Sequence, residues 1–323
     1  MPQLQGRDIG RTGFGLMGLT WRNNPCSTEQ AFEAMKTALE TGANFWNGGE
    51  FYGPPERNSL QLLNEYFTQY PEDSAKVVLS IKGGMGSNHG PDASADNTRR
   101  SVDNCLRLLD GKKKLDLFEH ARVDPQVPIE VSIRVLAEYI RAGKLGGICL
   151  SECSANSIRR AAKIHKIEAV EVEFSLFATE ILENGVAKTC GELDIPIIAY
   201  SPLSRGFLDD MRRHLPRFQK DNFDNNMKLV GEVEQVAKRK GCTVGNVAIA
   251  WVKAQSGKNG LPEIIPIPGA TTKDRVTENN TDVRLNNDDL KELDEALKRC
   301  EIKGDRYPSG INDLNFGDSP EEK

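Results

Sequence analysis

The amino-acid sequence predicts a single (β/α)8 barrel, an α/β fold of the TIM-barrel type. Short β-type runs alternate with amphipathic helical segments along the 323 residues, a pattern typical of a parallel sheet. The first seven strand starts lie about 21 to 38 residues apart, which fits one strand, one helix and short loops. An open doubly wound sheet would carry GxGxxG after its first strand, and Gly13, Gly15 and Gly18 do not form that motif.

Eight apolar runs are the expected strands. They begin near Gly15, Asn44, Val77, Leu115, Ile148, Ala169, Ile195 and Ile264. Amphipathic spacing predicts the helices that separate and follow them. These helices are expected at residues 27–41, 56–70, 97–109, 128–142, 154–166, 181–193, 229–240, 244–253 and 287–299. In the first helix, Ser27 and Gln30 have the spacing of a capping box, and Gly42 suits the C-terminal end.

The last two strand starts are 69 residues apart, too far for one crossover. The polar residues 209–226 in this gap indicate an excursion on the surface. Because barrel proteins bind ligands with the loops that follow their strands, residues 205–228 are expected to cover a bound ligand. We expect one domain over residues 1–323, ending in a helix and tail at 287–323.

Composition narrows the range of partners. With 42 Lys and Arg against 47 Asp and Glu, the net charge is −5, which disfavours nucleic-acid binding. The sequence has no run of about 18 apolar residues for a membrane span and no signal-peptide core. Seven scattered cysteines and four histidines lack disulfide or metal-site spacing. We expect a monomer in a reducing compartment, the cytoplasm or the nucleus, that binds a small molecule and no metal.

Polar side chains follow the expected strands, at the end of the barrel where reactive groups gather. These candidates are Asn47, Tyr52, Lys82, Glu119, His120, Ser151, Glu152, Glu171, Glu173, Tyr200 and Ser201. Singly, each residue type also fits an ordinary structural role, such as a lysine that reaches water. A tyrosine and a lysine from adjacent strands make a proton donor, because the ammonium favours the phenolate and lowers the tyrosine pKa.

Four segments resemble the aldo-keto reductase family, over residues 15–279: GLTW, NFWNGGEFYG, AYSPLSRG and PIPGATTKDRVTEN. The resemblance implies a catalytic set of Tyr52, Lys82, Asn47 and His120, with Tyr52 as proton donor. It also implies NADPH as the cofactor, covered by residues 205–228. The cofactor-binding residues that it implies are Thr20, Trp21, Ser151, Glu152, Glu171, Tyr200, Ser201, Pro202, Leu203, Ser204, Arg205, Gly206, Gly269, Thr271, Lys273, Arg275, Glu278 and Asn279.

The last of these segments also suits a phosphate on physical grounds. A turn rich in Gly and Thr precedes a helix that begins near Thr272, so backbone N–H groups and the positive helix end face an anion. Lys273 and Arg275 add charge. An ordinary helix start with solvated cations is the alternative, and the matching AYSPLSRG segment favours phosphate binding.

Two positions near the expected proton donor depart from the family pattern. Asn47 stands where the family has an aspartate that holds the lysine ammonium, and an amide supplies no charge to Lys82. Glu50, close in sequence, is the candidate for a compensating charge. Glu171 stands where the family has a glutamine that binds the nicotinamide carboxamide. A glutamate accepts a hydrogen bond from the carboxamide N–H2 but cannot donate to the carboxamide oxygen, which leaves that role to Ser151 or water.

His120 lies one residue before the position of the family histidine, which is occupied by Ala121. On a regular strand, a shift by one residue turns the side chain to the other face. His120 would then lie between strand and helix, and Ala121 would line the site. Alternatively, a β-bulge brings His120 back toward Tyr52. Without a histidine, the site would rely on Glu119 or water.

The expected function is reduction of an aldehyde with NADPH. The segments WNGGEFYG and FEHARVDP resemble the fungal pyridoxal reductase branch of the family, which implies pyridoxal as the substrate. A broad aldehyde reductase is the alternative within the same class. A cofactor-bound regulatory subunit with little turnover is the alternative from another class.

Overall fold

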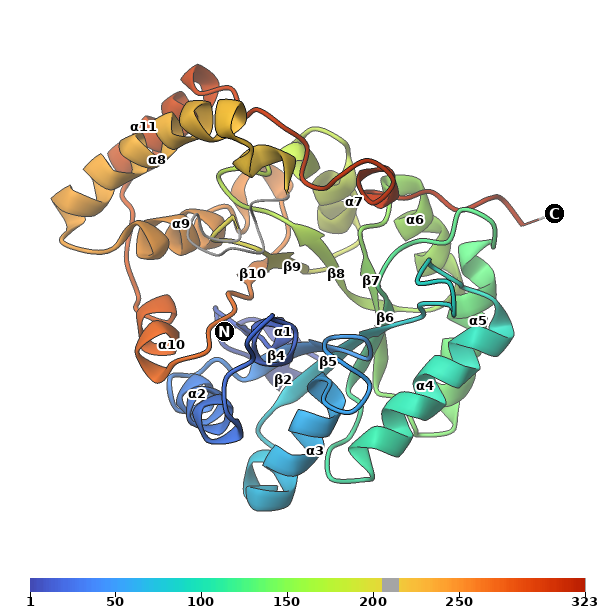
Figure 1. Ribbon diagram of the computed structural model, residues 1–323. Coiled ribbons are helices and arrows are strands. Elements are labelled where there is room, and N and C mark those ends of the chain that lie inside the picture. Colours follow the sequence, from blue (N-terminus) through green and yellow to red (C-terminus); the bar gives the residue numbers. More distant parts are fainter. Residues whose placement is uncertain (205–214, 323) are drawn as a thin grey trace.

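The computed structural model describes residues 1–204 and 215–322. Within these residues, eight parallel strands follow one another around a barrel in chain order (Figure 1). They are β3 (Phe14–Gly15), β4 (Phe45–Gly49), β5 (Val78–Gly83), β6 (Leu117–His120), β7 (Gly147–Ser151), β8 (Ile167–Glu173), β9 (Ile197–Tyr200) and β10 (Ile264–Pro266). The barrel closes where Gly15 pairs with Gly269 and Gly13 N donates to Pro266 O over 2.9 Å.

Helices surround this barrel (Figure 1). They are α1 (Met17–Thr20), α2 (Thr28–Glu40), α3 (Ser59–Gln69), α4 (Ala95–Leu109), α5 (Ile129–Arg141), α6 (Ala155–Ile164), α7 (Val186–Glu192), α8 (Lys220–Lys240), α9 (Val244–Lys253), α10 (Lys273–Asn279) and α11 (Asn287–Arg299). The alternation of strands and helices confirms the predicted (β/α)8 barrel. In the described part of the chain, no helix is both long and apolar enough to cross a membrane.

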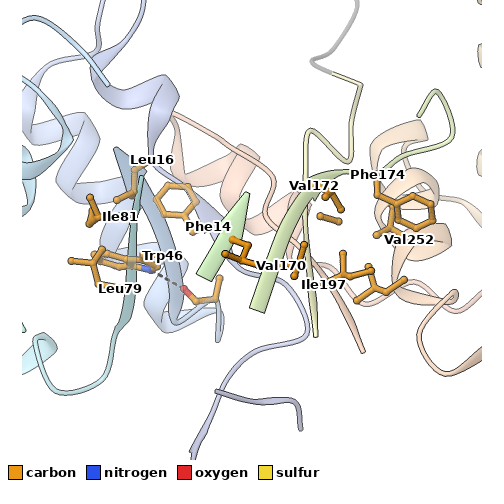
Figure 2. Packing of buried hydrophobic residues seen from close by; sticks show 14 of the residues in the cluster. Phe14, Leu16, Trp46, Leu79, Ile81, Val170, Val172, Phe174, Ile197 and Val252 are labelled. Atoms are coloured by element: carbon orange, nitrogen blue, oxygen red, sulfur yellow. Dashed lines mark hydrogen bonds between the residues drawn. The ribbon is translucent and has the colours of Figure 1, made fainter. Parts of the chain in front are cut away.

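Side chains that alternate along the strands build two apolar layers. Outward-facing Trp46 and Leu79 pack in the larger cluster between sheet and helices (Figure 2). Inward-facing Phe45 and Val78 belong to a smaller cluster inside the barrel. The Trp46 indole N–H donates to Ala43 O over 2.8 Å, so its burial leaves no donor unpaired. Each such side chain contributes about 1.5–3 kcal/mol through burial.

A hairpin of β1 (Gln3–Leu4) and β2 (Arg7–Asp8) closes the N-terminal end of the barrel. Leu4 and Ile9 join the inner apolar cluster. Gln5 and Gly6 take left-handed φ angles of 52° and 70°, as a two-residue hairpin turn requires. This hairpin was not predicted from the sequence, because strands of two residues show no hydrophobic periodicity.

The structure corrects the expectation for the long connection before β10. Residues 220–228, expected in a covering loop, form the beginning of α8, which starts nine residues before the helix predicted at 229–240. A single turn of 3-10 helix, η4 (Pro216–Phe218), precedes it. Residues 205–214 of the expected loop lie outside the described residues.

Two smaller helix predictions also need correction. Ser27 Oγ accepts from Gln30 N over 3.3 Å, but Gln30 Nε2 donates to Thr271 O over 2.8 Å, so the capping box is only half formed. This contact ties α2 to the turn before α10. The helix expected at 181–193 is divided into η2 (Glu180–Leu182) and α7, because Gly185 takes a φ of 87° between them.

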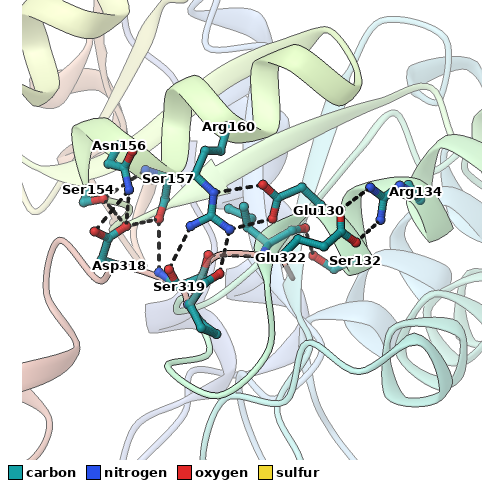
Figure 3. Close-up of polar contacts among 12 residues, drawn as sticks. Glu130, Ser132, Arg134, Ser154, Asn156, Ser157, Arg160, Asp318, Ser319 and Glu322 are labelled. Atoms are coloured by element: carbon teal, nitrogen blue, oxygen red, sulfur yellow. Dashed lines mark hydrogen bonds and ion pairs between the residues drawn. The ribbon is translucent and has the colours of Figure 1, made fainter.

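The C-terminal tail passes α7 and α6 and ends against α5 (Figure 1). Arg160 on α6 forms a bidentate ion pair with Glu130 on α5, at 2.8 and 2.6 Å, and donates to Ser319 O over 2.8 Å (Figure 3). Gly317 N donates to Glu152 O over 2.7 Å, directly after β7. The tail is therefore attached at the same end of the barrel as the candidate residues.

Candidate active site

Four candidate side chains point into the barrel near the C-terminal ends of its strands. Asn47 lies on β4, Lys82 on β5, Glu119 on β6 and Glu171 on β8, and all four are buried. The parallel register pairs Lys82 directly with Glu119. Because buried charges require partners, these groups have to satisfy one another.

Glu171 links this cluster. Lys82 Nζ donates to Glu171 Oε1, and Asn47 Nδ2 donates to Glu171 Oε2 over 2.6 Å. The same amide nitrogen donates to Glu119 Oε1 over 3.0 Å. Asn47 therefore holds two carboxyl groups with its two N–H bonds, and the counter-charge of Lys82 comes from β8.

Glu50 does not supply the missing charge. Its carboxylate accepts from Arg100 Nη1 over 2.9 Å and also binds Ser101 and Asn104 on α4. It faces the helix layer and has its own cation. The expectation of compensation from Glu50 is wrong, because the side chain leaves the strand on the side opposite Lys82.

The charges of the cluster follow from its burial. Burial alone lowers the Lys82 pKa, but Glu171, Tyr52 and Glu119 outweigh burial, and the pKa lies above its usual value. Burial and the neighbouring Glu171 raise the pKa of Glu119 well above its ordinary range. The cluster therefore favours the charged form of Lys82 and disfavours the charged form of Glu119.

Tyr52 lies in the loop after β4 and is only 7% exposed. Its ring packs so closely on Gly49 that a Cβ there would come within 2.7 Å of it. Thr20 Oγ1 donates to Tyr52 O over 2.7 Å, and the Trp21 ring centroid lies 5.6 Å from the Tyr52 ring. Burial raises the pKa of Tyr52 to about 12, although the Lys82 charge opposes the increase. Thr20 and Trp21, expected at the cofactor, thus also position Tyr52.

His120 does not join this cluster. Gly83 pairs with His120, and Ala121 N then donates to Gly83 O over 3.0 Å, so the strand continues regularly and His120 faces outward. Its Nε2 lies 3.2 Å from Thr98 Oγ1 on α4. The structure thus contradicts its place in the catalytic set, since a regular strand turns its ring away from Tyr52.

A second buried cluster lies beside the first and includes a residue of the C-terminal tail. Arg306 Nη2 donates to Glu152 Oε1 over 2.6 Å and to Tyr200 OH over 2.9 Å, and Arg306 Nε donates to Glu173 Oε2 over 3.0 Å. Tyr200 OH also donates to Glu152 Oε1 over 2.7 Å, and Lys82 Nζ lies 4.8 Å from the centroid of the Tyr200 ring. The Tyr200 ring thus connects the two clusters.

Three residues of the site were not predicted from the sequence: Arg306, Tyr307 and Arg122. Tyr307 OH lies 3.2 Å from Tyr200 OH, and the Arg122 guanidinium lies 5.6 Å from the centroid of the Tyr307 ring. Two of the candidate residues at strand ends, Glu152 and Glu173, are acidic, and the sequence assigned no cation to either. That was the available signal for a missing cation. A buried carboxylate requires a cation, and the tail contains one.

Ser151 and Glu152 lie where the resemblance puts the nicotinamide carboxamide. Burial raises the Glu152 pKa, but Arg306 and Arg122 outweigh burial and lower it, so the group is a carboxylate. Glu152 Oε2 and Ser151 Oγ are buried and have no hydrogen-bond partner among the described residues. These atoms are available to a ligand.

The segment after β9 forms a tight turn. Ser201 and Ser204 take left-handed φ angles of 51° and 52°, and Ser204 N donates to Ser201 O over 2.8 Å. Pro202 is buried in this turn, and Leu203 packs against the outer core. Arg205 and Gly206 lie outside the described residues.

The expected adenosine end lies between β10 and α10. Gly269 and Thr271 form the turn, and Thr272 caps the helix by accepting from Arg275 N. The cations are engaged with neighbouring acids: Lys273 Nζ lies 2.9 Å from Glu33 on α2, and Arg275 Nη1 lies 2.8 Å from Glu278.

Asn279 closes this region at the end of α10. It is buried, and its Nδ2 has no hydrogen-bond partner among the described residues. An unsatisfied amide donor in the interior costs about 1–3 kcal/mol, which a bound acceptor would recover.

The chain is similar to several known proteins in sequence and in fold. The model of the aldo/keto reductase family matches residues 11–298. A Schizosaccharomyces pombe protein named "Probable pyridoxal reductase 2" is 41% identical, covering 95% of this chain and 97% of its own. Another protein of that yeast, named aldo-keto reductase yakc with NADP(+), is 35% identical over 95% of this chain and 94% of its own. The solved structure of a Gluconobacter oxydans glycerol dehydrogenase matches with a TM-score of 0.79 and 22% identity, covering 93% of this chain and 96% of that one.

Proposed function

The chain belongs to the aldo/keto reductase family, and on this premise we propose that it is an NADPH-dependent aldehyde reductase that acts on pyridoxal. One observation carries the proposal: the buried phenol of Tyr52 lies in the field of the Lys82–Glu171 ion pair. A phenol beside a fixed ammonium is suited to donate a proton to a carbonyl oxygen. The name of the 41% identical yeast relative supports pyridoxal as the substrate.

In this proposal the chain supplies the proton and its stabilisation. Bound NADPH supplies the hydride. Tyr52 gives its proton to the carbonyl oxygen and becomes a phenolate. Lys82 stabilises that phenolate, because its pKa lies above the ordinary value and it stays charged throughout the neutral range. Exclusion of water from the barrel interior strengthens this attraction.

The described residues fit NADPH at both ends. Ser151 Oγ and Asn279 Nδ2 are buried polar atoms without partners, in the regions proposed for the carboxamide and the adenine. Arg275 and Lys273 would bind the 2′-phosphate at the beginning of α10, in exchange for Glu278 and Glu33 of the free protein. The remaining expected contacts, from Ser201 to Gly206, would hold the pyrophosphate.

A small side chain and a positive charge at this end of the barrel support an aromatic substrate. Ala121, with its small side chain, follows Glu119 on the inward side of β6. Arg122, which is held by Ala121 O over 2.8 Å, and Tyr307 bring positive charge and an aromatic face to the same end of the barrel. A pyridine ring with a phenolic oxygen matches both features.

The test is steady-state NADPH oxidation with pyridoxal and with several unrelated aldehydes. The proposal expects kcat/KM to be at least about tenfold higher for pyridoxal than for the rest of the panel. Equal values across the panel would indicate a broad aldehyde reductase instead. Binding of NADPH without oxidation by any aldehyde would indicate a regulatory barrel and refute the proposed activity.

We also propose that the protein works as a monomer in the cytoplasm or nucleus. All seven cysteines are unpaired, as expected in a reducing compartment. Light scattering of the purified chain tests the monomer, because a dimer would double the 35.7 kDa mass.

A further inference from the structure

Lys82 is a buried ammonium, 5% exposed, and its register partner on β4 is Gly49, while Asn47, two residues earlier on that strand, carries only an amide. Glu171, on the far side of β6 and β7, provides the carboxylate that touches it. An unpaired ammonium in such a place is unfavourable and tends to lose its proton. The charge that the proposed reaction needs on Lys82 therefore depends on Glu171.

We propose that Glu171 is a positioning residue for the reaction, which keeps Lys82 charged and oriented toward Tyr52, and that Asn47 fixes Glu171 in that role. This inference rests on the proposed function, since it concerns the same proton donor. It assigns the counter-charge to β8, whereas the β4 position contributes only hydrogen bonds.

Asn47 and Glu171 depend on each other. The Asn47 amide nitrogen lies 2.6 Å from Glu171 Oε2 and 3.0 Å from Glu119 Oε1. A carboxylate at position 47 would lose both N–H···O bonds and would place a negative charge against the carboxylate of Glu171. An amide at position 47 therefore suits a carboxylate at position 171. Exchanging the two groups would put the carboxylate at 47 and the amide at 171, so the pair would still consist of one carboxylate and one amide.

Glu119 does not replace Glu171 as the counter-charge. Its Oε2 receives no hydrogen bond from the described residues, and burial together with Glu171 raises the pKa of its carboxyl group, which disfavours the charged form. The Tyr200 ring, 4.8 Å from Lys82 Nζ, attracts the ammonium but carries no charge.

The test uses three variants of nearly unchanged size: Glu171→Gln, Asn47→Asp, and the double variant that exchanges the two groups. Asp116→Asn is the matched control, because Asp116 forms a buried ion pair with Lys113 before β6, at the other end of the barrel. The readouts are the pH profile of kcat with NADPH and pyridoxal, and the midpoint of thermal unfolding.

We expect Glu171→Gln to lower kcat about 10²-fold at pH 7 and to move the alkaline limb of its pH profile down by at least about one unit. The alkaline limb moves to lower pH because loss of the Glu171 carboxylate lowers the pKa of Lys82, so the ammonium deprotonates at lower pH. The double variant should restore kcat at least about tenfold over Glu171→Gln and return the limb toward the wild-type position. Asn47→Asp alone should lower thermal stability. Asp116→Asn should lower stability without moving the limb.

An active wild type with an unchanged pH profile in Glu171→Gln would overturn the inference and leave the proposed function intact. A folded double variant no better than Glu171→Gln would also overturn it. If Glu171→Gln does not fold, thermal unfolding of the double variant is the deciding measurement. A folded double variant supports the charge exchange, and an unfolded double variant overturns the inference. A wild type without turnover of any aldehyde refutes the proposed function instead, and the same unfolding comparison still tests the pairing.

Discussion

Replacement of His120 by asparagine tests whether this histidine has a structural or a catalytic role. The ring faces α4, where Nε2 lies 3.2 Å from Thr98 Oγ1, and its edge contacts Phe118 with 5.8 Å between ring centroids. Burial lowers the pKa of His120 from 6.5 to about 4, although Asp124 and Asp92 oppose the change. The folded protein therefore keeps the ring neutral in mildly acidic solution.

The size of the pH-dependent change in folding stability follows from proton linkage. The unfolded chain binds a proton at this histidine below pH 6.5, whereas the folded chain does so only near pH 4. Stability from the neutral ring is thus fully present above pH 6.5 and lost as the pH falls toward 4. This loss amounts to about 2 kcal/mol at pH 5 and about 3 kcal/mol when complete. His120→Asn should remove this part of the acid dependence.

Urea unfolding of both proteins between pH 7.5 and 4.5, with turnover measured at pH 7, provides the assay. His89→Asn is the control, because His89 is exposed and its loss should leave the acid dependence unchanged. We expect the stability difference between wild type and His120→Asn to change with pH while kcat stays within about threefold. A folded His120→Asn protein of unchanged stability with about a 10²-fold loss of kcat/KM would refute this reasoning and return His120 to the reaction.

Two further substitutions test the cofactor and the tail. Arg275→Ala should raise the KM for NADPH far more than that for NADH, because a charge-assisted bond to the 2′-phosphate contributes about 1.5–3 kcal/mol; equal effects would contradict the assignment. Arg306→Met should lower stability by about 3–5 kcal/mol, since Glu152 and Glu173 stay buried without their cation. Limited proteolysis should then cleave the tail faster, and unchanged unfolding and cleavage would show that the ion pairs do not hold it.

The sequence predicted the barrel because each of its strands is a recognisable apolar run between helices. The runs VVLSI and IPIIAY are almost continuously apolar, as expected of strands in a parallel sheet that is buried on both faces, and they contain most of β5 and all of β9. The N-terminal hairpin escaped prediction because its strands have two residues each. The beginning of α8 escaped because Lys220–Asn226 is polar, and helix formation there depends on tertiary contacts such as Asn226 Nδ2 to Lys303 O.

The positions of Asn47, Lys82 and Glu171 at strand ends were predictable, but their pairing was not. Which of two nearby carboxyl groups meets Lys82 depends on the direction of each side chain, and Glu50 turns outward while Glu171 turns inward across the barrel. The role of Arg306 was also hidden, because 133 residues of chain separate it from Glu173. For His120, the sequence left an outward and an inward direction open, and the regular pairing of the strand confirms the outward one.

The most direct test of the proposed reaction compares wild type with Tyr52→Phe, measuring turnover of pyridoxal and binding of NADPH on the same preparations. The phenylalanine ring preserves the packing against Gly49 and Trp21 and removes only the proton donor. We expect NADPH affinity to stay within about threefold of wild type while kcat falls by about 10²-fold or more. Retention of more than about a tenth of kcat by the variant would show that another group donates the proton.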